Sequence, residues 1–214
     1  MNFSTSLVWA TERWLEPDLY KIYKIKKWLI SRNQILEERV VEIIRKRRDY
    51  KSKNRDQVYR FGPYQATYIH ESARLAFEEN EYETSEGLAV INKRINGIDV
   101  NPSCNIGATY GFGHCMNIVI GGIGNCGDMN FYSHSITIGR YEEKRPILGN
   151  KIVIMPGAVI AGNSVIGDNV TISSGTVIIN LTIPSGVLVY RCKEDGVIKY
   201  KSAKKDYWES YFTN

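Results

Sequence analysis

Three histidines and four cysteines are the residues of this sequence best suited to chemistry near neutral pH. They are His70, His114 and His134, and Cys104, Cys115, Cys126 and Cys192. A neutral imidazole titrates near pH 6.5 and takes a proton from a hydroxyl that attacks an electrophile. The cysteines have no CxxC spacing and no paired histidines nearby, so the sequence predicts free thiols and no metal site. A histidine alone is more often structural than catalytic, so its surroundings must decide.

Length and composition favour one domain, or one domain with an appendage. The sequence has 214 residues, of which 43% are hydrophobic and 24% are charged, and these values exclude a disordered chain. No apolar run approaches the ~18 residues that span a bilayer. The first residues lack the charged and apolar regions of a signal peptide. We therefore expect a cytoplasmic protein.

The first half of the sequence has the spacing of amphipathic helices. Apolar residues recur every three or four positions from residue 18 to about residue 48, and shorter helical patterns occur at 65–79 and 84–93. Gly62-Pro63 lies before the second pattern, and Asn96-Gly97 ends the third. The sequence therefore predicts an α-helical region over residues 1–95.

A dense basic stretch with interleaved aromatic residues lies between Lys21 and Arg55. It has two interpretations. The basic N-terminal helix either seats the protein peripherally on an anionic membrane, or presents a solvated face and packs on top of an oligomer. We favour the second. No motif of a nucleic-acid-binding protein is present, so no nucleic-acid partner is expected.

The second half of the sequence repeats every six residues. Branched or small residues occupy the start of each six, and glycine or asparagine often ends it. The starts are Val100, Ile106, Phe112, Ile118, Ile136, Ile152, Ala158, Ser164, Val170, Thr176 and Thr182. A period of six is typical of a β-solenoid with three sixes per coil. The charged segment 142–146 interrupts the repeat and is predicted to leave the wall as a loop.

The non-repeat residues within this half carry a family resemblance. They are GIDVNP at 97–102, GHCMNIVIG at 113–121, SITIG at 135–139, KRP at 144–146 and IVIMPGAVIAGN at 152–163. This series resembles the serine acetyltransferase branch of the hexapeptide-repeat acyltransferases, which also contains O-acetyltransferases of bacterial surface sugars. The resemblance implies an α+β chain whose helical region precedes a left-handed parallel β-helix at 96–190, with a tail at 191–214.

The resemblance also implies a homotrimer that binds acetyl-CoA, its co-substrate, between neighbouring subunits. The family motif places an aspartate 15 residues before the catalytic histidine, and here these residues are Asp99 and His114. His114 is then the general base, and Asp99 orients it and stabilises the imidazolium. His134 either lines the acceptor site and donates to the developing oxyanion, or is a structural residue of the wall. His70, in the helical region, has a structural interpretation.

Further residues are assigned by matching positions to the family. The residues expected to contact acetyl-CoA are Gly139, Pro156, Gly157 and Ser174. Those expected to bind the acceptor are His134, Lys144, Arg145 and Gly113. Gly113 departs from serine acetyltransferases, which have an amine-binding aspartate there, whereas Lys144 and Arg145 keep positive charge in the loop.

These departures favour an acceptor other than an amino acid. The sequence thus predicts an acetyl-CoA-dependent O-acetyltransferase that acts on a hydroxyl of a sugar or a glycan precursor in polysaccharide biosynthesis. The alternative within the same chemistry is a serine O-acetyltransferase of cysteine biosynthesis. A third interpretation, a solenoid that serves only as a scaffold, conflicts with the Asp99 and His114 pair.

Overall fold

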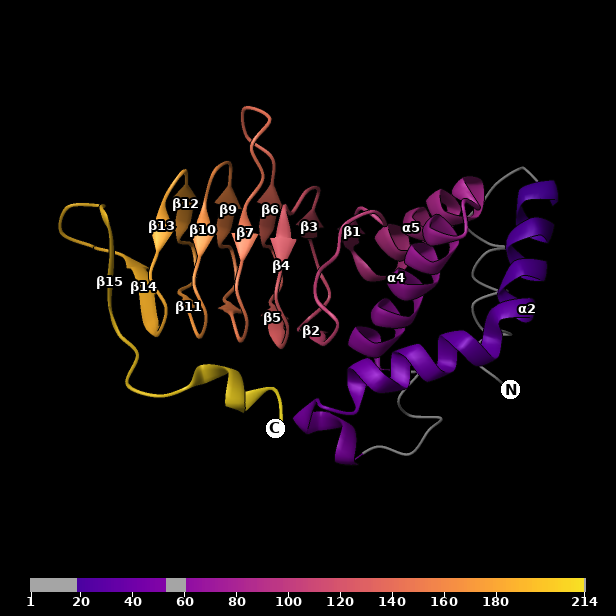
Figure 1. Cartoon of the computed structure of the whole chain (residues 1–214), viewed down its shortest axis with the longest axis horizontal. Coiled ribbons are helices and arrows are strands. Elements are labelled where there is room, and N and C mark those ends of the chain that lie inside the picture. Colours follow the sequence, from indigo (N-terminus) through magenta and orange to yellow (C-terminus); the bar gives the residue numbers. More distant parts are fainter. Residues whose placement is uncertain (1–18, 53–60, 214) are drawn as a thin grey trace.

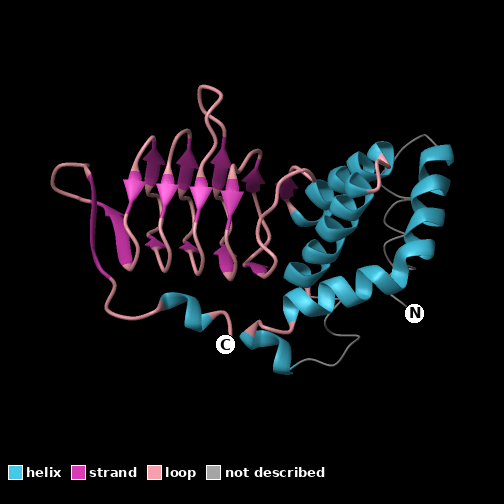
Figure 2. Ribbon diagram, in the orientation of Figure 1, coloured by secondary structure: helices cyan, strands magenta, loops and turns pink. Residues whose placement is uncertain are grey.

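The computed structural model describes residues 19–52 and 61–213, and it joins a helical region to a three-sided solenoid (Figure 1). Figure 2 shows the long helices gathered at one end of an elongated molecule and the strands at the other. The helices are α2 (Leu19–Ile44), η1 (Arg48–Ser52), α4 (Gly62–Glu78), α5 (Tyr82–Asn96) and η2 (Tyr207–Ser210). The predicted order of a helical region followed by a parallel β-solenoid is therefore confirmed.

The long helices form where the apolar spacing predicts them, with shifted ends. In α2, Ile25, Leu29 and Leu36 face the core and are buried. α4 begins at Gly62, before the predicted start, because Pro63 lies in its first turn, where a missing N–H breaks no helical hydrogen bond. α5 ends at Asn96, and Gly97, with a φ of 63°, caps the helix and leads directly into the first strand.

The solenoid has short strands on three sides. They are β1 (Ile98–Val100), β2 (Tyr110–Phe112), β3 (Ile118–Ile120), β4 (Asn125–Cys126), β5 (Asn130–Tyr132), β6 (Thr137–Gly139), β7 (Ile147–Leu148), β8 (Val153–Ile154), β9 (Val159–Ala161), β10 (Val165–Ile166), β11 (Thr171–Ile172), β12 (Val177–Ile179), β13 (Thr182–Ile183), β14 (Val187–Arg191) and β15 (Ile198–Ser202). The three sheets have the orders β1-β3-β6-β9-β12, β4-β7-β10-β13 and β2-β5-β8-β11-β14-β15. All pairs are parallel except β14 with β15.

The strand register follows the six-residue repeat. Val159 pairs with Val177 and Val153 with Thr171, so one coil takes 18 residues there. Thr137 pairs with Val159, a separation of 22, because the segment between β6 and β7 adds residues outside the wall. Figure 1 shows this loop standing clear of the coils, as predicted for the charged insertion.

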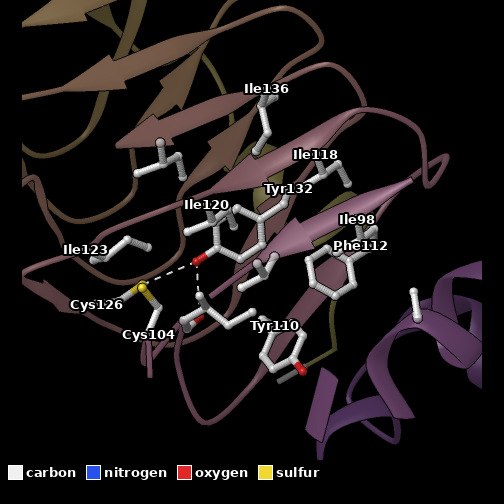
Figure 3. Packing of buried hydrophobic residues seen from close by; sticks show 14 of the residues in the cluster. Ile98, Cys104, Tyr110, Phe112, Ile118, Ile120, Ile123, Cys126, Tyr132 and Ile136 are labelled. Atoms are coloured by element: carbon white, nitrogen blue, oxygen red, sulfur yellow. Dashed lines mark hydrogen bonds between the residues drawn. The ribbon is translucent and has the colours of Figure 1, made fainter. Parts of the chain in front are cut away.

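The interior of the solenoid is mainly a column of apolar side chains, with a few buried polar residues such as Asn130, Ser164 and Thr176 among them. Figure 3 shows Tyr132 lying among isoleucines near the first coils. The Tyr132 side chain is fully buried, and its hydroxyl donates to the Ile106 carbonyl at 3.0 Å. The same oxygen lies 3.2 Å from Sγ of Cys126. Cys126 is a free thiol, as are the other three cysteines.

Beyond β15 the chain turns back along the solenoid. We call residues 203–213 the strap. It includes η2, and Figure 1 shows it passing beneath the coils to the segment that follows α2. There Phe212 forms an antiparallel bridge with Arg47. The sequence analysis assigned this segment only as a tail, so its return to the helical region is new.

We expect Tyr132→Phe to destabilise the protein by about 1–3 kcal/mol, because the change leaves the buried Ile106 carbonyl without its donor. Tyr200→Phe is the matched control, since it removes the same group, a tyrosine hydroxyl, from a side chain that is 54% exposed. Urea denaturation at one protein concentration measures both variants. Equal midpoints for the two would contradict the assigned role of the buried hydroxyl.

Candidate active site

His114 and His134 lie along one edge of the solenoid, in successive coils. His114 follows β2 and has a φ of 50°, so its backbone adopts the left-handed conformation at a corner of the solenoid wall. His134 follows β5, and the two ring centroids are 6.1 Å apart with the planes at 78°. Nδ1 of His134 lies 3.3 Å from the Ser135 hydroxyl oxygen. The structure therefore brings the two histidines together.

Asp99 lies on a different sheet from His114. It belongs to β1, which pairs with β3, whereas the strand before His114 pairs with β5. Its carboxylate accepts a hydrogen bond from Nζ of Lys93 at 2.5 Å. Within the described chain, no hydrogen bond joins Asp99 to His114. One chain alone therefore does not form the predicted pair.

Lys144 and Arg145 also lie away from His114. They belong to the loop between β6 and β7, where Lys144 forms a β-bridge with Tyr141. The Arg145 side chain lies against Gly122. Neither residue lines the cavity beside His114.

Most of the residues assigned to acetyl-CoA stack along the edge that carries His134. The N–H of Gly157 donates to the His134 carbonyl at 3.3 Å, and the N–H of Gly175, next to Ser174, donates to the Pro156 carbonyl at 2.9 Å. Gly139 is the last residue of β6, with open space where a side chain would stand. Pro156 lines the same cavity as His114.

A cavity of about 510 Å³ lies beside His114. Segments far apart in the sequence line it, from the end of the helical region, the solenoid wall and the strap. Its lining includes Arg48, Asp49, Gly113, Phe131, Pro156 and Tyr211. The sequence analysis assigned Gly113, His114 and Pro156 of this lining to the site, but none of the lining residues from the helical region or the strap.

Arg47 holds these segments together. Its side chain is buried, and its Nη1 donates to the Phe112 carbonyl at 3.0 Å. The guanidinium also pairs with both oxygens of Asp49, each at 3.2 Å. It lies 5.4 Å from the centroid of the Phe131 ring. A side chain at Gly111 would collide with this guanidinium, so glycine is required there.

Asp49 is a functional candidate that the sequence analysis missed. The residue lines the cavity, and its carboxylate accepts a hydrogen bond from the Tyr64 hydroxyl at 2.5 Å. Burial, and then the neighbouring carboxylate, raise the pKa of the Tyr64 phenol well above its ordinary value, so it stays a donor. Arg48 lines the cavity as well. The sequence feature that could have identified Asp49 is its position as the one acidic residue in the basic stretch between Arg45 and Arg55.

Gly113 has a steric reason to be glycine. A Cβ atom there would lie 2.3 Å from Cζ of Phe131. The ring cannot easily move away, because it stacks on Tyr211 with centroids 3.6 Å apart and planes at 15°. The position next to His114 therefore lacks a carboxylate because an aromatic ring fills the space.

Two other titratable groups are unsuited to catalysis. Burial raises the pKa of the Cys115 thiol to about 12, so little thiolate exists beside His114 at neutral pH. Burial lowers the pKa of His70 to about 3, so this buried residue of α4 is a neutral ring. These findings are consistent with a structural His70.

Several basic residues in the described part of the basic stretch between Lys21 and Arg55 are engaged within the protein. Arg32 pairs with Glu79 at 2.8 Å, and Arg39 pairs with Glu78 at 2.9 Å. Together with the burial of Arg47, these pairs leave the membrane interpretation without support from those side chains. Of the described helices, none combines the length and apolarity needed to cross a bilayer.

Comparison with known proteins identifies relatives of this chain. The family model of the bacterial transferase hexapeptide (six repeats) matches residues 145–180. A serine acetyltransferase of Helicobacter pylori is 30% identical over 122 residues, which are 55% of this chain and 71% of the relative. One of Staphylococcus aureus is 28% identical over 141 residues, or 62% of this chain, and the chain spans 66% of that relative's length.

A solved structure supports the same fold. The Brucella abortus serine acetyltransferase in complex with coenzyme A superposes with a TM-score of 0.67 at 17% identity, over 95% of this chain and 84% of that one. The chain belongs to the serine acetyltransferase-like branch of the hexapeptide-repeat acyltransferases, whose solenoid is a left-handed β-helix.

The expectation of a sugar or glycan-precursor acceptor was wrong, because both curated relatives are serine acetyltransferases. The role in polysaccharide biosynthesis has no support either. The error has a physical reason. The sequence argument relied on the missing carboxylate at position 113, whereas an aromatic ring fills the space there and an acidic residue of the helical region, Asp49, lines the same cavity.

We expect Gly113→Ala to destabilise the protein by about 1–3 kcal/mol, because the added methyl group must displace a ring packed on its far side. Gly121→Ala is the matched control, because it is also in the solenoid wall and a Cβ there meets nothing within 4 Å. Thermal and urea denaturation measure both variants. A Gly113→Ala protein as stable as the control would show that the ring of Phe131 yields freely.

Proposed function

We propose that this protein is a serine O-acetyltransferase that transfers the acetyl group of acetyl-CoA to the hydroxyl of L-serine. One observation carries the proposal. The cavity beside His114 is lined by both an acidic residue, Asp49, and a basic residue, Arg48. A free amino acid carries an ammonium and a carboxylate, so this pair of side chains complements it. Membership of the serine acetyltransferase-like branch supports the same acceptor.

His114 acts as the general base. Its imidazole takes the proton of the serine hydroxyl as that oxygen attacks the thioester carbonyl of acetyl-CoA. The new carbon–oxygen bond forms, the carbon–sulfur bond breaks, and the imidazolium returns the proton to the thiolate of coenzyme A. Serine and acetyl-CoA must both be bound before transfer. His134, one coil away, donates to the oxyanion that develops on the carbonyl oxygen.

The edge of the solenoid carries acetyl-CoA. Pro156 lines the same cavity as His114, so a thioester lying along Pro156 and Gly157 ends at the base. Gly139 and Ser174 extend this path. Glycine at 139 leaves the backbone open for close approach of the pantetheine arm. The coenzyme A complex of the Brucella abortus relative supports this choice of co-substrate.

The working unit is a homotrimer. Asp99, Lys144 and Arg145 lie away from His114 in one chain, so a neighbouring protomer supplies them to each site. Apolar side chains exposed on the sheet that contains Asp99 support this assembly, since a neighbour would cover them. They are Val119, Val177 and Ile179. In the trimer, Asp99 orients His114 of the next protomer, and Lys144 and Arg145 join Arg48 at the acceptor carboxylate.

We expect wild-type protein to acetylate L-serine with a kcat/KM of ~10⁴ M⁻¹s⁻¹ or above. L-glycerate, which has a hydroxyl in place of the ammonium, is the matched acceptor and should react far more slowly. Asp49→Asn should narrow the serine-to-glycerate ratio by about 10–100-fold, because it removes a charge-assisted hydrogen bond to the ammonium. Release of the coenzyme A thiol measures each rate. Equal use of both acceptors by wild type would refute an amino-acid site.

We expect His114→Ala to lower turnover by ~10²–10⁴-fold and Asp99→Asn to lower it less. Light scattering should give the mass of three chains for both variants. Mixed trimers, made by co-expressing the two variants, should regain activity, because some sites then combine an intact Asp99 and an intact His114 from different chains. Mixed trimers without activity would place the pair in a single protomer.

A further inference from the structure

The strap is bonded to the segment that carries the charged residues of the cavity. The N–H of Arg48 donates to the Tyr211 carbonyl at 2.9 Å, and the N–H of Thr213 donates to the Lys46 carbonyl at 2.7 Å. Nε of Arg48 also donates to the carbonyl of Phe212 at 3.1 Å. The strap therefore fixes the position of Arg48, one residue before Asp49.

Buried aromatic side chains anchor the strap to the solenoid. Phe212 is fully buried and Trp208 is 4% exposed, and both pack against Phe131 and Val153 of the wall. Nζ of Lys151 lies 4.2 Å from the centroid of the Trp208 ring. Since large aromatic side chains gain most from burial, this segment is a fixed part of the fold rather than a solvated tail.

Tyr211 forms one wall of the cavity beside His114. Its ring is stacked on Phe131 at 3.6 Å, and the Arg47 guanidinium lies 5.4 Å from the same Phe131 ring. Phe131 in turn occupies the space beside Gly113. The stack thus extends from the strap to the residue that precedes His114. Both rings line the cavity.

We propose that Tyr211 is a specificity-determining residue that limits the length of the acceptor. By holding Phe131 beside Gly113, it closes the side of the cavity next to His114. L-Serine is therefore favoured over L-homoserine, which is longer by one methylene, and over L-threonine, which is bulkier by one methyl group. This inference rests on the proposed function for the identity of the favoured acceptor. Discrimination of one methylene by packing amounts to about 10–200-fold in kcat/KM.

The test compares Tyr211→Ala with Tyr211→Phe, which keeps the stacked ring and is the matched control. We measure kcat/KM for L-serine, L-homoserine and L-threonine, together with the KM for acetyl-CoA and the melting temperature. Tyr211→Ala should raise the homoserine-to-serine ratio by about 10-fold or more. Tyr211→Phe should leave it unchanged, and neither variant should alter the KM for acetyl-CoA more than about twofold.

A merely structural role for Tyr211 would lower all rates together and leave the acceptor ratio unchanged, and that result overturns the inference. Equal effects of the alanine and phenylalanine variants also overturn it. If Tyr211→Ala fails to fold, Tyr211→Leu replaces it, because leucine keeps apolar volume but not the flat stack.

The design separates this inference from the proposed function. If wild type does not acetylate L-serine, the proposed function fails. The comparison is then made on the best acceptor of a hydroxy-compound panel and its homologue with one more carbon. The same change in ratio supports the role of Tyr211, and an unchanged ratio refutes it.

Discussion

The buried guanidinium of Arg47 is the interaction on which the arrangement of the whole site depends. A buried cation is tolerated only when its donors are satisfied, and Arg47 achieves this by bonding to the wall at Phe112 and to Asp49. Gly111 leaves the room for it. One bond reaches the solenoid wall and the other holds the nearby Asp49, so the same side chain that is stabilised by its partners also places the acidic residue at the cavity beside His114.

The regular parts of the fold could be predicted because their signals are local. Stacked coils repeat the same environment every six residues, so the positions of Ile152, Ala158 and Val170 already define the wall. The spacing of three and four likewise predicts α2 from its own side chains. The charged loop before β7 and the shared edge of His114 and His134 follow from the same repeat.

The remaining parts of the site could not be predicted, because they depend on contacts with no period. Nothing in the spacing shows that Asp49 meets the cavity, since the buried guanidinium that orients it crosses to the solenoid. The 15-residue separation of Asp99 and His114 gives a distance along the chain, but it does not show that Asp99 and the strand before His114 belong to different sheets. Gly113 was interpreted as a lost ligand, whereas the neighbouring ring explains it.

The strap changes how a solenoid of this kind unfolds. Coils in a linear array touch only their neighbours, so the end coils ordinarily fray first and independently. Here a hydrogen bond between Arg48 and Phe212 spans 164 residues and ties the region before the first coil to the segment after the last. Fraying at either end must break this closure, so the array opens as one cooperative unit. Because such distant segments must meet, the final docking step is expected to be slow.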